Sequence, residues 1–124
     1  MSDPPKQVLV VDDEKDVQDF IRMVLESAGY AVRSAGDGKE ALGAIESDPP
    51  DLVVLDLMMP VMDGWGLLER LRRIPNPLAV VILSAFPDEW RALRAGAWEC
   101  LAKPFDRSHL LATCARALQS TARR

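Results

Sequence analysis

Cysteine is scarce in this sequence, and long apolar segments are missing. The two cysteines, Cys100 and Cys114, are too few for a disulfide framework, so we expect free thiols in a reducing cytosol. No apolar run approaches the length of a transmembrane helix, and residues 1–6 contain no apolar stretch of the kind found in signal peptides. We therefore expect a cytoplasmic protein without membrane contact.

A block of basic residues is also absent. Fifteen Lys and Arg residues oppose nineteen Asp and Glu residues, which gives a net charge of −4. A mildly acidic chain is poorly suited to bind nucleic acid through charge, so we expect no direct nucleic-acid partner for this segment. The length of 124 residues, 48% of them hydrophobic, is typical of one globular domain with its own core. We expect that domain to fill 1–124, with a core over about 6–119 and a polar tail or linker remnant at 120–124.

Short apolar runs are the clearest local pattern that is present. Residues 8–11, 52–55 and 80–83 are entirely apolar and are each followed closely by polar residues. Such runs are typical of strands that are buried on both faces, as in a parallel sheet. Two weaker segments, 31–35 and 98–102, are predicted as further strands.

Amphipathic segments lie between these strands. The spacing i, i+3, i+4, i+7, i+8 of apolar residues predicts a helix that ends at Gly29, with one buried face formed by Val17, Phe20, Ile21, Val24 and Leu25. Further helices are expected over 37–47, after an N-cap at Asp63, over 88–95, and after an N-cap at Asp106.

Five strands that alternate with five helices predict an α/β fold, a single doubly wound (βα)5 domain around a parallel sheet. In such folds the functional crevice lies at the carboxyl ends of the strands. The residues that follow each predicted strand are therefore the candidates for chemistry.

Those strand ends carry Asp12 and Asp13, Asp56, Ser84 and Lys103. Three carboxylates that meet at one edge repel one another, and a hard divalent cation such as Mg²⁺ relieves that repulsion. A lysine suits a phosphoryl oxygen, and a serine hydroxyl can donate a hydrogen bond to another. Each residue alone has an ordinary structural explanation, such as a helix start or a solvated charge. Their joint occurrence at four strand ends has no such structural explanation.

The set contains every group that phosphoryl transfer needs. A carboxylate can act as a nucleophile and form an aspartyl phosphate, and the protein must otherwise supply a metal and groups that bind the phosphoryl oxygens. Asp56 is the best candidate nucleophile because it stands alone at the end of a central strand. Asp12 and Asp13 are better suited to hold the metal as a pair.

At this point the sequence resembles the receiver domain of bacterial two-component response regulators. The resemblance runs from about Lys6 to Leu118 and is carried by Val8–Glu14, Leu52–Pro60, Met62–Gly64, Val80–Ala85, Gly96–Ala97 and Lys103–Phe105. It implies a flavodoxin-like fold with strand order 2-1-3-4-5. It also implies a phosphorylation-activated switch that is not an enzyme beyond its own phosphorylation and dephosphorylation.

The resemblance also assigns roles at the metal site. Asp56 corresponds to the phosphoacceptor, which receives its phosphoryl group from a histidine kinase or a histidine phosphotransfer protein. Asp13 corresponds to a direct Mg²⁺ ligand, and Asp12 to a ligand that acts mainly through water. Met58 is at the position whose backbone carbonyl completes the metal site.

Three further roles follow from the same resemblance. Ser84 corresponds to the switch hydroxyl, Lys103 to the lysine that contacts the phosphate, and the Lys103–Pro104 bond to a cis peptide. A downstream protein partner is expected to recognise the phosphorylated state. The chain is expected to act alone or as part of a longer regulator, as a monomer or a weak dimer.

The sequence departs from the family at two points. Cys100 stands three residues before the lysine, where the family usually has Tyr or Phe, so Trp98, Phe86 or a backbone movement would have to couple the hydroxyl to the output surface. The serine and the lysine are 103 − 84 = 19 positions apart, about three fewer than usual, most simply because the helix over 88–95 is short.

Three alternatives remain at this point. A small aspartate-nucleophile phosphatase would also use Asp12, Mg²⁺ and a lysine, but the chain has no spare length for the usual substrate cap. A flavin- or nucleotide-binding module would need a Gly- or hydroxyl-rich loop where this chain has the acidic residues 12–14. A receiver fold that binds partners without phosphorylation is the third.

Overall fold

The computed structural model describes residues 4–56, 64–71, 73, 78–85 and 99–122. Five strands form one parallel sheet: β1 (Gln7–Val11), β2 (Ala31–Ala35), β3 (Leu52–Asp56), β4 (Ala79–Ser84) and β5 (Glu99–Ala102). The helices described are α1 (Lys15–Ser27), α2 (Gly38–Ser47), α3 (Gly64–Leu71) and α5 (Arg107–Ala122). The strand order β2-β1-β3-β4-β5 confirms the predicted fold class and topology.

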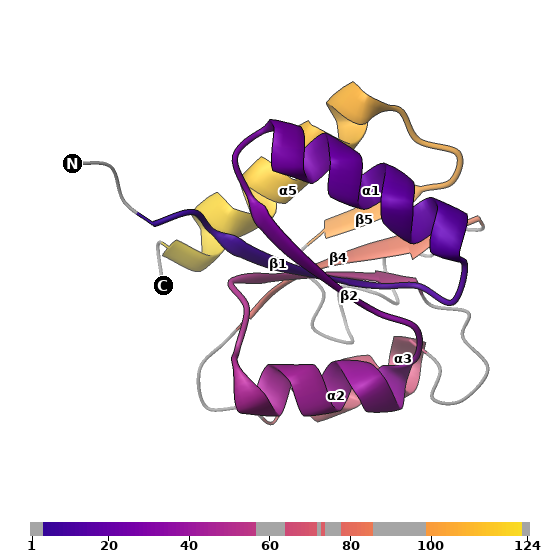
Figure 1. The fold of residues 1–124 in the computed structure, drawn as a ribbon, viewed down its shortest axis with the longest axis vertical. Helices are drawn as coiled ribbons and strands as arrows, with labels where there is room; N and C mark the ends of the chain where they lie inside the picture. Colours follow the sequence, from indigo (N-terminus) through magenta and orange to yellow (C-terminus); the bar gives the residue numbers. More distant parts are fainter. Residues whose placement is uncertain (1–3, 57–63, 72, 74–77, 86–98, 123–124) are drawn as a thin grey trace.

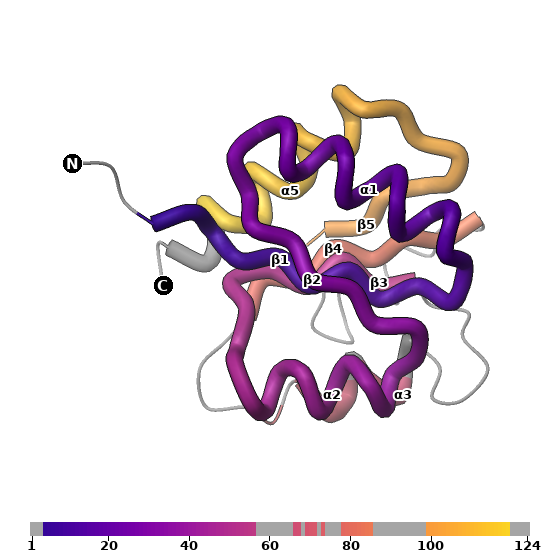
Figure 2. Tube along the Cα trace, viewed as in Figure 1, coloured from indigo at the N-terminus to yellow at the C-terminus, as the bar shows by residue number. Residues whose placement is uncertain are grey.

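The sheet is the middle of three layers. Figure 1 shows α1 and α5 over one face of the sheet and α2 and α3 over the other, and the tube in Figure 2 traces the same layers. Alternate residues of β1 enter opposite cores: Val8 and Val10 pack on the side of α1 and α5, and Leu9 and Val11 pack on the side of α2 and α3. All four are fully buried, which confirms that the apolar runs are strands covered on both faces.

One helix ends and another begins at the residues that the sequence predicted. Gly29 has φ of 96°, a left-handed conformation that favours glycine, and its N–H donates to the carbonyl of Glu26 where α1 ends. Asp106 caps α5, because its Oδ1 accepts a hydrogen bond of 2.8 Å from the backbone N–H of His109. The same helix continues to Ala122, so 120–122 are helical where an irregular polar tail was expected.

The prediction that Phe20 belongs to the buried face of α1 is wrong. Ile21, Val24 and Leu25 are buried as expected, but Phe20 is 38% exposed. Its ring lies 6.2 Å from that of Phe105, measured between centroids, in a tilted arrangement. Phe20 therefore lies at the edge of the helix stripe and pairs with the loop after β5 instead of entering the core.

Some predicted features fall outside the described residues. These are the loop over 57–63 with its N-cap Asp63, the helix over 88–95, and the aromatic residues Phe86 and Trp98. Within the described ranges, none of the helices has the length and hydropathy that crossing a membrane requires.

Candidate functional site

Three carboxylates meet at the carboxyl edge of the central strands. β1 and β3 pair in register, with Val11 opposite Leu55, so the next residues of both strands, Asp12 and Asp56, are brought side by side. One carboxylate oxygen from each of Asp12, Asp13 and Asp56 lies within 4.8 Å of the others. Asp12 is fully buried and Asp56 is 5% exposed, whereas Asp13 is exposed.

Asp12 is held by partners on nearly every polar atom. Its N–H donates to the carbonyl of Ala35 at 3.1 Å, and its carboxylate Oδ1 accepts a hydrogen bond of 2.9 Å from the N–H of Glu14. Its own carbonyl accepts a hydrogen bond from the side-chain amide of Gln18. Among the described residues, Oδ2 of Asp12 has no hydrogen-bond partner, although the atom is buried.

The ionised form of Asp12 is disfavoured in the domain without metal. Burial raises the pKa of Asp12, and the neighbouring negative charge of Asp56 adds to the rise. The hydrogen bond from Glu14 and the positive charge of Lys103 oppose it without cancelling it. A buried carboxylate of this kind has a strong tendency to acquire a cation.

Lys103 lies against the same carboxylates. Its Nζ is 3.4 Å from Oδ2 of Asp56 and 3.7 Å from Oδ2 of Asp12, and its side chain is 24% exposed. Its backbone N–H donates to the carbonyl of Ser84 at 2.9 Å, which joins the ends of β5 and β4. The bond to Pro104 is cis, as the resemblance implied. Ser84 is 8% exposed at the end of β4, next in sequence to Leu83, which pairs with Asp56 across the sheet.

The residues present fit a hard divalent cation. Carboxylate oxygens are the ligands that Mg²⁺ prefers, and the partial exposure at Asp13 leaves room for water and phosphate oxygens. The buried Oδ2 of Asp12 supports this fit, because it accepts no hydrogen bond from the described residues and the one cationic group near it among them is the ammonium of Lys103, at 3.7 Å. The predicted carbonyl ligand of Met58 lies outside the described residues.

Five of the predicted site residues lie in the described part of the chain. The structure brings all five to one edge of the sheet: Asp12, Asp13, Asp56, Ser84 and Lys103. Sequence reasoning missed Gln18, whose amide enters the site from α1. A polar residue in an amphipathic helix carries no sign that it turns back toward the sheet, so only the three-dimensional arrangement reveals it.

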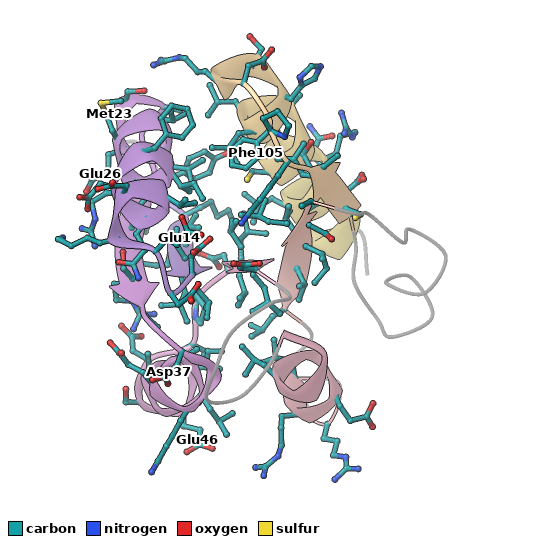
Figure 3. All side chains as sticks on the ribbon, turned by 90° about the vertical axis from the view of Figure 1, so that its right-hand side faces the viewer. Glu14, Met23, Glu26, Asp37, Glu46 and Phe105 are labelled. Atoms are coloured by element: carbon teal, nitrogen blue, oxygen red, sulfur yellow. The ribbon has the colours of Figure 1, made fainter. Side chains whose placement is uncertain are left out.

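A mainly apolar groove of about 500 Å³ adjoins this site. It is lined by Asp16, Val17, Phe20, Ala85, Lys103, Pro104 and Phe105. Figure 3, which views the carboxyl edge of the sheet, shows Glu14 and Phe105 there, with Met23 pointing outward from α1. Met23 is 60% exposed.

The two cysteines are not joined in a disulfide, and they lie in different environments. Cys114 is buried between α5 and the sheet, and burial raises the pKa of its thiol to about 12. Cys100 is half-buried on β5 and packs against the core on the side of α2 and α3. The thiol of Cys100 therefore occupies part of the space beside the sheet where the family usually has an aromatic ring.

Comparison with known proteins decides between the interpretations of this site. The family model of the response regulator receiver domain matches residues 8–115. The chain belongs to the response regulator receiver domain family. A receiver domain is the phosphorylation-activated switch of a two-component system, and this is the function class of the chain. Such domains are generally signalling switches and not enzymes that turn over a separate substrate.

Relatives and solved structures agree with this assignment. The response regulator MprA of Mycolicibacterium vanbaalenii is 42% identical over 120 residues, which are 94% of this chain and 52% of MprA. The chemotaxis protein CheY4 of Vibrio cholerae has a TM-score of 0.84 at 30% identity, with 91% of this chain and 98% of CheY4 covered. NtrX of Brucella abortus has a TM-score of 0.88 at 34% identity, with 95% of this chain and 28% of the NtrX chain covered. The chain thus spans about half the length of the curated relatives it matches.

Proposed function

We propose that Asp56 accepts a phosphoryl group from a phosphohistidine of a histidine kinase or histidine phosphotransfer protein, and that Asp12, Asp13 and Asp56 hold Mg²⁺ for this step. The observation that carries the proposal is the meeting of three carboxylates within 4.8 Å, with the Lys103 ammonium 3.4 Å from Asp56. Further support is the buried Oδ2 of Asp12, which lacks a hydrogen-bond partner among the described residues.

The chemistry divides among the residues of the site. A carboxylate oxygen of Asp56 forms a bond to phosphorus while the bond from phosphorus to the donor's imidazole nitrogen breaks, and that nitrogen keeps the electron pair. Lys103 contacts one phosphoryl oxygen and the hydroxyl of Ser84 donates a hydrogen bond to another. When bound, Mg²⁺ supplies positive charge against the phosphoryl oxygens and the carboxylates. The carbonyl of Met58 is proposed as a further ligand.

The proposal is tested by intact mass after incubation with Mg²⁺ and a small acyl phosphate. Wild type is expected to gain one phosphoryl group, and Asp56→Asn is expected to gain none because an amide is not a nucleophile here. A gain in both proteins would contradict the assignment of Asp56. No gain in wild type, together with no binding of Mg²⁺ in a titration, would favour a receiver fold that binds partners without phosphorylation.

We further propose that the groove beside Lys103 receives the protein that donates the phosphoryl group. The groove is continuous with the phosphoacceptor edge, since Lys103 belongs to both. Asp16 lines the groove, and Glu14 and Asp19, close to it in the chain, are exposed as well. An amphipathic helix that carries basic residues at its rim is the complementary partner surface.

Phe20→Asp provides a test of that surface. Phe20 is 38% exposed, so a docking protein can reach it. Because the variant places a charge in the apolar groove, it is expected to slow transfer from a phosphorylated histidine kinase about 100-fold or more. Phosphorylation by the small acyl phosphate is expected to stay within about twofold of wild type, because Phe20 does not touch the carboxylates. Radiolabelled kinases that transfer to wild type provide the assay, and equal losses with both donors would contradict a docking role.

A further inference from the structure

Gln18 connects three elements at the edge of the site. It lies in the first turns of α1, and its side-chain Nε2 donates to the carbonyl of Asp12 and, at 3.3 Å, to the carbonyl of Ala35. Ala35 ends β2, and its carbonyl also accepts the N–H of Asp12. One amide group therefore ties the end of β1 to the end of β2 and both to the helix.

We propose that Gln18 is a positioning residue: it fixes the backbone of Asp12 so that the carboxylate Oδ2 points toward Asp56, and thereby sets the affinity of the site for Mg²⁺. This inference rests on the proposed function of the three carboxylates. Among the described residues, the hydrogen bonds of the Gln18 side chain go to main-chain carbonyls and to no carboxylate oxygen of the site, so its effect passes through the main chain of Asp12.

The other hydrogen bonds of Asp12 show what the side chain of Gln18 adds. The N–H and Oδ1 of Asp12 are held by main-chain groups of Ala35 and Glu14. Within the described part of the chain, Gln18 is the side chain that holds the remaining main-chain atom, the carbonyl. With these three contacts made, Oδ2 is the atom of Asp12 that has no hydrogen bond among the described residues, and it faces the ammonium of Lys103 at 3.7 Å on the side where a metal ion would bind.

Electrostatic repulsion between the carboxylates explains why the contact of Gln18 with Asp12 should affect metal binding. Three carboxylates whose oxygens lie within 4.8 Å repel one another, so a carboxylate whose main chain is not held in place is displaced more easily from the position that a metal ion needs. A site whose ligands are already in place binds a metal more tightly than one that must be reassembled against this repulsion. Groups that hold metal ligands in place typically change metal affinity 10- to 100-fold when they are removed.

The test replaces Gln18 by methionine, which keeps the length and the methylene groups and removes the donor. The full chain is titrated with Mg²⁺ by calorimetry, and its Kd is compared with that of wild type. We expect the Kd to rise about 10-fold. Gln18→Asn, whose amide is one methylene too short to reach both carbonyls, is expected to weaken Mg²⁺ binding as well and replaces the methionine variant if that one does not fold.

Arg22→Met is the matched control. Arg22 lies one turn further along α1, and its guanidinium likewise donates to a carbonyl of β2, that of Val32 at 3.2 Å, but away from the carboxylates. Both variants lose contacts between α1 and β2, and Arg22→Met also loses a hydrogen bond of 2.9 Å to the hydroxyl of Ser34 and an exposed ion pair with Glu26. A merely structural role therefore predicts at least as large a loss of stability in Arg22→Met and an unchanged Kd in both variants. An unchanged Kd in Gln18→Met and Gln18→Asn, or an equal rise in Arg22→Met, would overturn the proposal.

The proposed function and the positioning role of Gln18 fail in different ways. If wild type does not bind Mg²⁺ at all, the proposed function fails together with the inference. If wild type binds Mg²⁺ and becomes phosphorylated on Asp56 while the Gln18 variants bind Mg²⁺ as wild type does, only the positioning role of Gln18 fails.

Discussion

Replacing Asp12 by asparagine is expected to stabilise the domain without metal while it slows phosphorylation by small donors roughly 100-fold. The loss of rate follows from the loss of one negative ligand, which weakens the binding of Mg²⁺ at the three carboxylates. The gain in stability follows from burial: Asp12 is fully buried, and burial raises the pKa of its carboxyl group. Asparagine keeps an oxygen that can accept the hydrogen bond from Glu14.

The pH dependence of this gain has a defined sign. The contribution of Asp12 to stability is fully present below its ordinary pKa of 3.8, and it is lost as the pH rises through the raised pKa of the folded state. In that range the folded domain holds a proton that the unfolded chain has released. The stabilisation by Asp12→Asn is therefore smallest at acidic pH, where the folded domain keeps the proton, and it grows as the pH rises through the raised pKa of Asp12.

Urea unfolding in the presence of a metal chelator, repeated across pH, measures this difference. Adding Mg²⁺ should stabilise wild type and have little effect on the variant, because binding to the folded state alone shifts the unfolding equilibrium. Asp19→Asn is the control: its side chain is 57% exposed and, among the described residues, forms an ion pair with the exposed Lys15, so a change within about 0.5 kcal/mol is expected. Destabilisation by Asp12→Asn at neutral pH would contradict the argument.

The strands and the site residues could be predicted because both follow from local sequence. A run such as 80–83 is apolar at every position, and only a strand covered on both faces buries it in full, as β4 does. The parallel arrangement then brings the residues after each strand to one edge, so Asp12, Asp56 and Lys103 follow from the topology without knowledge of distances.

The features that could not be predicted are contacts between distant segments. Phe20 fits the periodicity of a buried helix face, yet its environment depends on Phe105, which is 85 positions away in the chain. Gln18 binds the ends of β1 and β2, and no spacing in the sequence marks it. Arg107 similarly donates from α5 to the hydroxyl of Ser27 at the end of α1, at 2.9 Å. Helical periodicity reports which face is apolar and not which loop completes it.

Replacing Lys103 by methionine is expected to act on stability in the opposite direction to Asp12→Asn. The ammonium group lies 3.4 Å from Oδ2 of Asp56 and 3.7 Å from Oδ2 of Asp12, so its removal leaves these two buried carboxylates without their nearby cation. Removal of one partner from a buried ion pair commonly costs 3–5 kcal/mol; with Lys103 24% exposed, we expect a loss of about 2 kcal/mol without metal.

The same variant separates metal binding from phosphoryl transfer. Without the lysine charge, Mg²⁺ has no neighbouring cation to repel it and should bind more tightly, so Mg²⁺ restores most of the lost stability. Phosphorylation should nevertheless slow roughly 100-fold, because a charge that contacts a phosphoryl oxygen is missing. Titration calorimetry and intact mass measure the two effects separately, and weaker Mg²⁺ binding would show that Lys103 supports the metal site instead.

Two comparisons make the interpretation of Lys103→Met specific. Lys15→Met removes a lysine whose side chain is 83% exposed, so its stability and Mg²⁺ affinity should match wild type. In the background of Asp12→Asn the repulsion that Lys103 offsets is smaller, so Lys103→Met should cost less there than in wild type, by at least about 0.5 kcal/mol. Additive losses in this double-mutant cycle would mean that the ammonium stabilises the domain through Asp56 or through packing, without coupling to the buried carboxylate of Asp12.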